Sequence, residues 1–428
     1  MSRPKVSFTT LGCRLNQAES DSMADDLARA GVALAGSEES PDIVVINTCT
    51  VTREATKASR MAIRRAVRAH ADAKVVVMGC YAVSDRAEVE AIEGVDFVFG
   101  NDEKERFAEV LGAQSSLAPL LQIGGLRRAP SASDRVRANL KVQTGCDEWC
   151  TFCIIPKTRG ALRSMNEEAL VEEARARVEA GARELVLTGV HLGKYEYDRG
   201  GDERSLVRLM RRLLDIDGVL RLRLSSILCR HLTDEVVDFM RDEPRVCRYL
   251  HVPLQSGDDR ILAAMHRPYR AADYISAMER VQDAIPDVAL ATDIIVGFPG
   301  ETEEAFAATE RLVERVQFSK LHVFRYSARE NTAAAAMADA VHPDVKRDRS
   351  KSLISQGAEI RKRFLEGHLG RRLEVLVEDE RSVEEESICS GQTDDYVRVW
   401  FSAEGLLGRM VDVVAEEIRA DGVRGRAA

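Results

Sequence analysis

Short apolar runs alternate with helical stretches twice along this chain of 428 residues, and the alternation restricts its fold. Parallel strands need long crossover connections, usually helices, so such a series predicts a parallel sheet covered by helices. The first series predicts an α/β, doubly wound parallel-sheet domain over residues 1–112. Its expected strands are Val6–Thr9, Ile43–Ile46, Val75–Met78 and Phe97–Phe99.

The second series occupies residues 135–366, after a stretch at 113–134 whose Ala, Ser, Pro and Gly content predicts a linker. Eight strand–helix units would close a barrel, so the six units counted here predict a partial (β/α)6 barrel with function at the C-terminal strand ends. Ser164-x-x-Glu167 predicts a capping box for a helix that Gly181 ends. The strands are expected near Leu140 and at Glu184–Leu187, Leu220–Leu224, Tyr249–Val252, Ala291–Val296 and Lys320–Phe324.

The last segment, residues 367–428, follows a basic helical connector at Pro343–Phe364. It is rich in residues that favour strands, which predicts a small β-barrel. The expected strands are Leu373–Val377, Tyr396–Trp400 and Arg409–Val414.

Three cysteines, Cys146, Cys150 and Cys153, share one loop just after the first strand of the second series. Thiolates at this spacing are typical of metal sites. Structural zinc needs four ligands, and the loop offers neither a histidine nor a fourth cysteine. An iron-sulfur cluster with one iron left open therefore fits the loop better than zinc.

Three further cysteines, Cys13, Cys49 and Cys80, each follow an expected strand of the first domain. The C-terminal ends of parallel strands share one edge of a sheet, so these thiols are expected to converge. Three converging thiolates predict a second cluster site. The alternative is that each cysteine is an ordinary buried residue. Cys229, Cys247 and Cys389 fit neither triplet and are interpreted as structural.

The Cys-x3-Cys-x2-Cys loop, with Phe152 before its third cysteine, resembles the cluster loop of radical S-adenosylmethionine (SAM) enzymes. Gly391-x-Thr393-x-x-Tyr396 resembles the RNA-binding TRAM module. With the N-terminal triplet, the whole chain resembles the methylthiotransferase family. Thr10–Gln17, Ile46–Thr52 and Leu187–Gly193 look most like the branch that acts on N6-threonylcarbamoyladenosine beside the tRNA anticodon. The alternatives are the branch that acts on isopentenyladenosine in tRNA and the branch that modifies an aspartate of a ribosomal protein.

The resemblance implies two 4Fe-4S clusters and SAM. Cys146, Cys150 and Cys153 would hold the catalytic cluster, which cleaves SAM to a radical that abstracts hydrogen from C2 of the adenine. The auxiliary cluster, on Cys13, Cys49 and Cys80, would carry or donate the sulfur. The implied partners are the tRNA anticodon stem-loop, an electron donor such as flavodoxin or ferredoxin, and a sulfur source.

The resemblance also implies contacts with SAM at the strand ends. Phe152 would meet the adenine, Gly189 the methionine amino group, Ser225 and Ser226 the ribose, and Gly297 would let the adenine approach the backbone; Gln255 would lie near the substrate. Gly297 could instead belong to an ordinary turn, and the two serines could bond their own loop.

A helix expected to start near Thr52 carries five basic residues at steps of three or four, a pattern that places them on one face. This basic stripe would contact phosphates of the anticodon stem, or it is simply a solvated face. Five alanines are expected on the opposite face, against the sheet. The stripe is Arg53, Lys57, Arg60, Arg64 and Arg68, and the alanines are Ala55, Ala58, Ala62, Ala66 and Ala69.

The bulk composition indicates a cytoplasmic enzyme without a membrane segment. The N-terminus lacks the apolar stretch of a signal peptide, and no run approaches the roughly 20 apolar residues of a membrane span. Nine cysteines in such a chain indicate reduced thiols or metal ligands. The net charge of −9 counts against a nucleic-acid partner but does not exclude one, because local basic patches matter more than the sum.

The chain departs from the family pattern in two loops. Leu228-Cys229-Arg230 replaces a common Glu-Pro, and Arg325, Ala328 and Ala333 stand where prolines are usual. A rival of a different class is a non-catalytic iron-sulfur protein that binds RNA. The glycine-bearing strand ends favour the enzyme, because a protein that only binds RNA has no use for a SAM groove.

Overall fold

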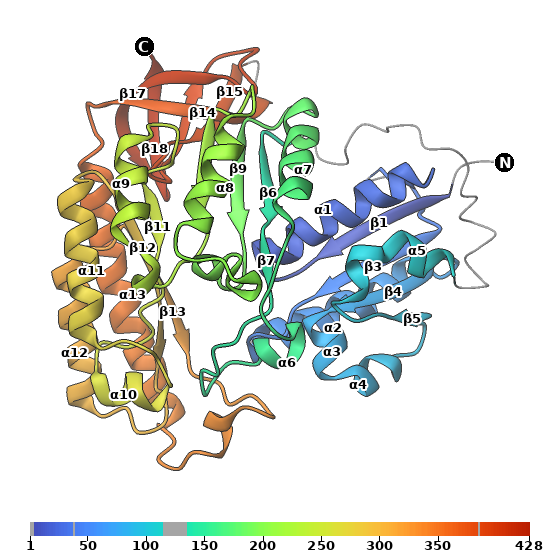
Figure 1. Ribbon diagram of the computed structural model, residues 1–428, viewed down its shortest axis with the longest axis horizontal. Coiled ribbons are helices and arrows are strands. Elements are labelled where there is room, and N and C mark those ends of the chain that lie inside the picture. The colour runs from blue at the N-terminus through green and yellow to red at the C-terminus, as the bar shows by residue number, and fades with distance from the viewer. Residues whose placement is uncertain (1–3, 37–38, 114–134, 384–385) are drawn as a thin grey trace. The chain divides into compact units, whose positions relative to one another are not determined.

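The computed structural model describes residues 4–36, 39–113, 135–383 and 386–428 (Figure 1). It forms two compact units. The described part of residues 1–134 makes up the first unit together with Thr144–Trp149 and Cys153–Arg163, and the remaining residues make up the second. The expected linker lies outside the described residues apart from its first residue, Ala113.

The first unit contains a parallel five-stranded sheet of order β2-β1-β3-β4-β5. This confirms the expected N-terminal parallel sheet, to which the structure adds the short edge strand β2. The strands are β1 (Lys5–Thr10), β2 (Ala33–Leu34), β3 (Ile43–Thr48), β4 (Lys74–Gly79) and β5 (Phe97–Val98). The helices are α1 (Arg14–Arg29), α2 (Arg53–Ala69), α3 (Cys80–Ser84), α4 (Arg86–Glu90), η1 (Glu103–Arg106), α5 (Phe107–Gly112) and α6 (Ile155–Arg159).

Helices cover both faces of this sheet (Figure 1). All six residues of β3 are buried, which matches its uninterrupted apolar sequence. Ile43 and Val45 pack in one apolar cluster with Met23 and Leu27 of α1. Alternate residues of β3 pack in a second cluster with side chains of α2, α3 and α4. The two clusters fix the sheet between two helical layers.

The second unit contains six parallel strands in two sheets, of order β10-β9-β6 and β11-β12-β13. Single parallel bridges, Leu222 to Val246 and Ser226 to His251, join the edge of β10 to the region of β11. The expected partial barrel is therefore present. The strands are β6 (Arg137–Lys141), β9 (Glu184–Thr188), β10 (Arg221–Leu224), β11 (Tyr249–His251), β12 (Ala289–Val296) and β13 (Lys320–Arg325).

Helices pack on the outer face of these strands. They are α7 (Glu167–Glu179), α8 (Ser205–Leu214), α9 (Asp234–Asp242), α10 (Asp259–Ala264), α11 (Ala271–Ala284) and α12 (Glu303–Val316). Three-residue or four-residue turns of 3-10 helix are η2 (Leu192–Lys194), η3 (Tyr197–Arg199), η4 (Cys229–His231) and η5 (Ala333–Ala336), and short strands β7 (Gln143–Thr144) and β8 (Arg163–Ser164) flank α6 in sequence.

The capping box expected at Ser164 is wrong. Asn166 is the N-cap of α7, and its side chain accepts a hydrogen bond from the backbone N–H of Ala169. Ser164 instead donates its hydroxyl to Asp198 at 2.6 Å. The local pattern assigned this hydroxyl to the helix N-terminus, but it bonds Asp198, which lies 34 residues away in sequence.

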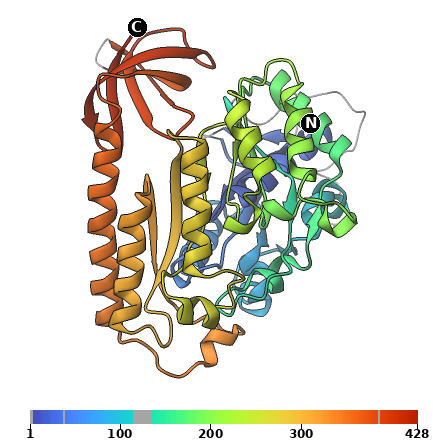
Figure 2. The same cartoon turned by 60° about the vertical axis from the view of Figure 1, so that its left-hand side comes forward.

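Helix α13 (Pro343–Glu366) leads from the partial barrel to a closed five-stranded β-barrel of order β14-β15-β16-β18-β17, with α13 running beside β13 (Figure 2). The barrel confirms the expected C-terminal β-domain. Strands β15 and β18 were not predicted from the sequence. The strands are β14 (Arg372–Val383), β15 (Glu386–Gln392), β16 (Arg398–Ser402), β17 (Met410–Arg419) and β18 (Gly422–Ala427).

One arginine of β10, Arg223, binds a loop of this barrel. Arg223 is fully buried, pairs with Glu184 at 2.7 Å and donates to the carbonyls of Thr393 and Asp394. Its guanidinium also stacks 4.2 Å from the centroid of the Tyr396 ring. The Gly391 to Tyr396 motif, which resembled an RNA-binding module, thus holds the barrel against the partial barrel.

No helix within the described ranges combines the length and the apolar character that a bilayer crossing needs.

Candidate iron-sulfur and cofactor sites

The C-terminal ends of three neighbouring strands carry the N-terminal cysteine triplet. Cys13 is the N-cap of α1, after β1; Cys49 directly follows β3; and Cys80 directly follows β4. Because β1, β3 and β4 are adjacent in the sheet, the three thiols share one edge. None of the nine cysteines forms a disulfide in the described structure.

The thiol of Cys49 interacts with the other two thiols of this edge. Burial raises the pKa of Cys49 to about 11, and the neighbouring Cys80 and Cys13 also raise it because two nearby thiolates would repel. In the described part of the chain, the one set of three His, Cys, Asp or Glu ligand atoms within 4.8 Å of one another contains no cysteine. The three thiols of this edge are therefore not all within 4.8 Å of one another.

Two glycines let the chain approach itself at this edge. A Cβ on Gly12, whose φ is +95°, would lie 2.7 Å from Cβ and 2.8 Å from Sγ of Cys49. A Cβ on Gly79, whose φ is +99°, would lie 2.3 Å from the carbonyl oxygen of Thr48. Only glycine adopts these conformations at such short contacts, so the residues before Cys13 and Cys80 shape the site.

Behind the thiols lies a fully buried charge network. Glu19 accepts hydrogen bonds from Arg159 at 2.8 Å and from Lys104 at 2.6 Å, and all three side chains are at most 2% exposed. Two cations and one anion leave a net positive charge beside the cysteines. Although burial opposes it, the pKa of Arg159 is raised by the charges of Glu19 and Cys80. The network is placed to balance the negative charge of thiolate ligands.

Asn16 ties the strand ends to α1. Its amide donates to the carbonyls of Leu11 at 2.7 Å and Thr48 at 3.0 Å, and its oxygen accepts from Arg159. The asparagine therefore connects the cysteine edge to the buried charges. No local sequence pattern pointed to Glu19, Lys104 or Arg159, because their pairings span 85 and 140 residues.

In the first unit, Cys146 and Cys153 of the cluster loop both receive backbone hydrogen bonds. The N–H of Glu148 donates to Sγ of Cys146 at 3.4 Å, and the N–H of Ile155 donates to Sγ of Cys153 at 3.4 Å. Such bonds stabilise a thiolate and raise the potential of any cluster that it holds. Both sulfurs are partly exposed, as a ligand-binding loop requires.

In the second unit, Cys150 is buried next to Arg267. The guanidinium of Arg267 donates to Sγ at 3.3 Å, and the charge of Cys150 helps to raise the pKa of Arg267 against the effect of burial. The backbone beside Cys150 is also held, since the N–H of Thr151 donates to the carbonyl of Met265 at 3.1 Å. Arg267 and the backbone contact of Thr151 therefore fix the position of the Cys150 side chain.

Two of the expected SAM residues are available for a ligand. The hydroxyl of Ser225 is buried and has no hydrogen-bond partner in the described part of the chain. A buried hydroxyl of this kind costs about 1–3 kcal/mol unless a ligand satisfies it. Phe152 packs edge-to-face on Phe298, with the ring centroids 6.5 Å apart, and is partly buried.

The other expected SAM residues have protein neighbours. Ser226 bonds Nδ1 of His251 at 2.6 Å, and a Cβ on Gly189 would lie 3.1 Å from Oε1 of Gln143. Gly297 has a φ of +72°, and a Cβ there would lie 2.3 Å from Cγ of Lys346. The side chain of Lys346 thus covers the glycine, and the proposed approach of the adenine requires that side chain to move.

Gln255 has a left-handed backbone, with a φ of +71°, and is nearly buried. Its N–H donates to the carbonyl of Asp293 and its carbonyl accepts from Ile295, so β12 holds it in this conformation. A non-glycine residue kept in this region stores strain, which is common at functional sites.

Helix α2 begins after Thr52, whose hydroxyl caps it, as expected. Arg53, Lys57, Arg64 and Arg68 of the basic stripe are exposed, whereas Arg60 is half-buried and pairs with Glu88 at 3.0 Å. The expected alanine face is wrong in part. The buried residues are Ser59, Ile63 and Ala66, whereas Ala58 and Ala69 are exposed. A single Ile outweighs several alanines in choosing the buried face, because it removes more apolar surface from water.

Two family models match this chain, one in the N-terminal domain and one in the partial barrel. The model described as "Uncharacterized protein family UPF0004" matches residues 5–100, and the model of the radical SAM superfamily matches residues 140–313. The first match contains Cys13, Cys49 and Cys80, and the second contains the cluster loop.

Several curated proteins are similar over nearly the whole chain. "Threonylcarbamoyladenosine tRNA methylthiotransferase MtaB" of Bacillus subtilis is 38% identical over 95% of this chain and 93% of its own length. The protein of the same name from Thermotoga maritima is 34% identical over 97% and 99%. "tRNA-2-methylthio-N(6)-dimethylallyladenosine synthase" of Thermobifida fusca is 35% identical over 96% and 85%.

A solved structure shares the fold. The radical SAM methyltransferase TsrM from Kitasatospora setae aligns with a TM-score of 0.56 and 17% identity, over 78% of this chain and 77% of that one. At this identity the likeness concerns the fold alone.

Proposed function

Because this chain belongs to the radical SAM methylthiotransferase family, we propose that it converts N6-threonylcarbamoyladenosine in tRNA to its 2-methylthio derivative. The relatives named for this substrate in Bacillus subtilis, Aquifex aeolicus and Thermotoga maritima support it, since they are 33–38% identical over almost their full lengths. The relatives named for dimethylallyladenosine are 34–36% identical, so that substrate is the second candidate.

The observation that carries the proposal is the second cysteine triplet. A radical SAM enzyme that only cleaved SAM would need one cluster loop. This chain also brings Cys13, Cys49 and Cys80 to one sheet edge, beside a buried network of net positive charge. A second iron-sulfur site of this kind suits a sulfur insertion, which needs a place to hold the sulfur.

Each residue has a part in this proposal. Cys146, Cys150 and Cys153 would hold the SAM-cleaving cluster, and Cys13, Cys49 and Cys80 the auxiliary one. Bound there, a reduced 4Fe-4S cluster supplies the electron that cleaves SAM. Arg267 would orient the Cys150 sulfur through its hydrogen bond, and the free hydroxyl of Ser225 would orient SAM by a hydrogen bond.

The basic stripe on α2 is the proposed contact with the anticodon stem. Its four exposed members have no ion pair among the described residues, and a phosphate backbone binds such groups. Arg64 and Arg68 also line a groove with Lys74 and His70. The groove contains Glu88 and Asp96 as well, so the stripe itself is the stronger candidate for phosphate binding.

Remaining parts of the proposal follow from this reaction. The enzyme would act in the cytoplasm, where tRNA is found. It would need an electron donor such as flavodoxin or ferredoxin and a sulfur source. We place the domain boundaries at residues 112, 135 and 366.

The test is an anaerobic reaction with two tRNAs, one carrying N6-threonylcarbamoyladenosine and one carrying dimethylallyladenosine, in the presence of SAM and a strong reductant. We expect methylthiolation of the first tRNA only, together with release of 5'-deoxyadenosine. Methylthiolation of the second alone would move the chain to the other tRNA branch. SAM cleavage without modification of either tRNA would contradict a tRNA substrate.

A further inference from the structure

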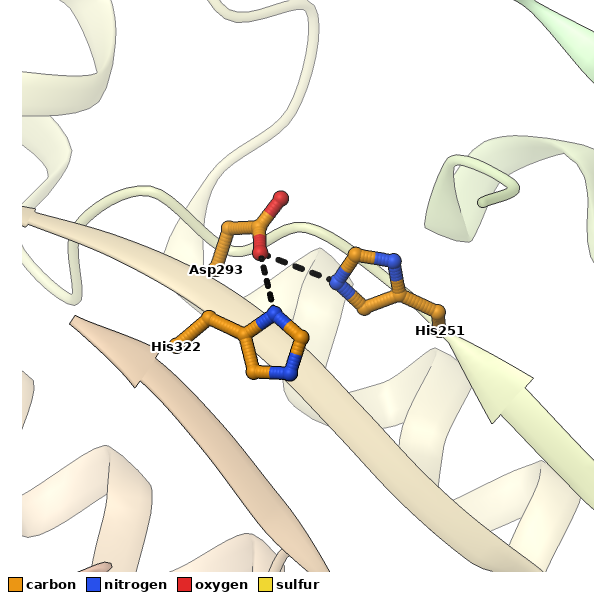
Figure 3. Close-up of side chains that lie close together, drawn as sticks. All are labelled: His251, Asp293 and His322. Carbon is orange, nitrogen blue, oxygen red and sulfur yellow. Dashed lines mark hydrogen bonds and ion pairs between the residues drawn. The ribbon is translucent and has the colours of Figure 1, made fainter. Parts of the chain in front are cut away.

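Three polar side chains meet on the second sheet of the partial barrel, outside the cysteine sites. His251, Asp293 and His322 come from β11, β12 and β13, which are neighbours in one sheet (Figure 3). Asp293 and His322 are direct cross-strand partners. Because side chains alternate along a strand, Asp293 lies opposite the face where Leu290, Ile294 and Val296 pack against the helices. The three residues therefore share the inner face of the partial barrel.

One oxygen of Asp293 is shared by the two imidazoles. Oδ1 lies 3.0 Å from Nε2 of His251 and 3.4 Å from Nδ1 of His322, and all three atoms are within 4.8 Å of one another. Ligands held about 2.0–2.1 Å from a tetrahedral zinc ion lie roughly 3.3 Å apart. The measured separations agree with that value, so one ion fits between the three atoms with little movement.

The surroundings resemble those of a built metal site. The second nitrogen of His251 bonds the hydroxyl of Ser226 at 2.6 Å, as metal-binding histidines usually bond a fixed partner. The two histidines stabilise the charged form of the carboxyl, so the pKa of Asp293 is lowered despite its burial. The side chains remain between 15% and 37% exposed, which leaves room for a further ligand.

We propose that His251, Asp293 and His322 form a binding site for a divalent transition-metal ion, with Zn²⁺ as its expected occupant. Two imidazoles and one carboxylate are a common zinc donor set, and three protein ligands leave the fourth position open. Water or an anionic oxygen can take that position. In the metal-bound form, the Asp293 carboxylate would bind the doubly charged ion instead of accepting hydrogen bonds from the two histidines.

The site shares no ligand with the two cysteine triplets, although Ser226, which bonds His251, is also one of the expected SAM residues. It contains no sulfur ligand, and its residues come from three strands whose positions are fixed by parallel pairing. Failure of the tRNA reaction would therefore leave this inference standing, and failure of zinc binding would leave the proposed function standing.

The test is zinc binding to the anaerobically reconstituted full chain, in which iron already fills the cysteine sites. The protein is dialysed against buffered Zn²⁺, and zinc and iron per chain are measured by mass spectrometry. We expect about one zinc per chain in the wild type and none in Asp293→Asn or His322→Gln, with equal iron in all three. Substitution with Co²⁺ should give the intense visible bands of a tetrahedral ion in the wild type alone.

Two further variants grade the result. Ser226→Ala removes only the partner of His251 and should weaken zinc binding by about 10–100-fold. His342→Gln is the matched control, because His342 lies 3.6 Å from Asp344 in an exposed pair that lacks a third ligand. Equal zinc in the wild type and in the folded His322→Gln variant, or loss of zinc in His342→Gln, would overturn the proposal. The triad would then be a hydrogen-bonded network without a metal.

Discussion

Removing the single anion of the buried network, by Glu19→Gln, should destabilise the first unit strongly. Glu19 is the shared partner of Arg159 and Lys104, and none of the three side chains is more than 2% exposed. The glutamine keeps the size of the side chain but removes its charge. Two buried cations then face each other without an anion between them.

The loss of unfolding free energy in Glu19→Gln depends on whether each buried cation can lose its proton. Burial already lowers the pKa of Lys104, so the lysine can lose its proton when Glu19 is neutral. Arg159 cannot deprotonate and keeps an uncompensated buried charge. Breaking one such pair costs about 3–5 kcal/mol of unfolding free energy, roughly a 150- to 4,000-fold change in the unfolding equilibrium.

The assay is hydrogen exchange of the β3 amides in cluster-free protein, because these fully buried residues report opening of the sheet. Glu105→Gln is the matched control. Glu105 pairs with Arg163 at 2.6 Å in the same unit, but its side chain is 37% exposed, so its loss should cost at most about 1 kcal/mol. If Glu19→Gln costs no more than Glu105→Gln, the network does not hold its charges as described.

Three other predictions concern separate sites. Ser225→Ala removes a buried hydroxyl that has no hydrogen-bond partner among the described residues, so the free energy of unfolding should stay unchanged or rise by about 1 kcal/mol. SAM binding, measured by equilibrium dialysis, should weaken about tenfold. An unchanged SAM affinity would contradict the assignment of Ser225 to the SAM site. Arg64→Gln with Arg68→Gln should weaken tRNA binding and reduce the slope of log affinity against log salt by about 0.7–0.9 per lost contact, whereas Arg204→Gln, at an exposed site elsewhere, should change neither. His368 pairs with Asp395 at 2.6 Å. Burial lowers the pKa of His368, but Asp395 raises it more, so the net shift is upward. The stabilisation of the folded state by this pair is therefore complete below about pH 6.5 and is lost as the pH rises through the raised pKa of His368. In His368→Gln this fall in barrel stability above about pH 6.5 should disappear from thermal unfolding curves, and a variant that kept it would exclude the pair as its cause.

Local sequence patterns and one general rule of sheet topology predicted part of the structure. The cysteines after β1, β3 and β4 meet because parallel strands end at one edge, which is a rule of topology. The cap at Thr52 and the long helix after residue 342 follow from local preferences in the same way. These elements needed no knowledge of distant contacts.

Features built by distant residues were missed or misassigned. Ser164 looked like a helix cap, but Asp198 binds its hydroxyl. Strands β15 and β18 contain glycines and charges that weaken a strand pattern, and only closure of the barrel explains them. A sequence shows the residue types in such contacts but not which residues pair.

His251 illustrates the same limit at a candidate site. A single histidine in a sequence is more often a buried core residue with satisfied hydrogen bonds than a metal ligand. Its neighbours Asp293 and His322 lie 42 and 71 residues further along the chain. Pairing of three parallel strands brings the three residues together. No spacing pattern in the sequence predicts this convergence.

The most direct test of the proposed function is nucleoside mass spectrometry of tRNA from cells that lack this protein. The cells are complemented with the intact chain, with Cys150→Ala or with Cys49→Ala. We predict that 2-methylthio-N6-threonylcarbamoyladenosine appears only with the intact chain, because each variant loses a ligand of one proposed cluster. If the nucleoside is absent with the intact chain, or appears equally with either variant, the proposed reaction or its two-cluster site is wrong.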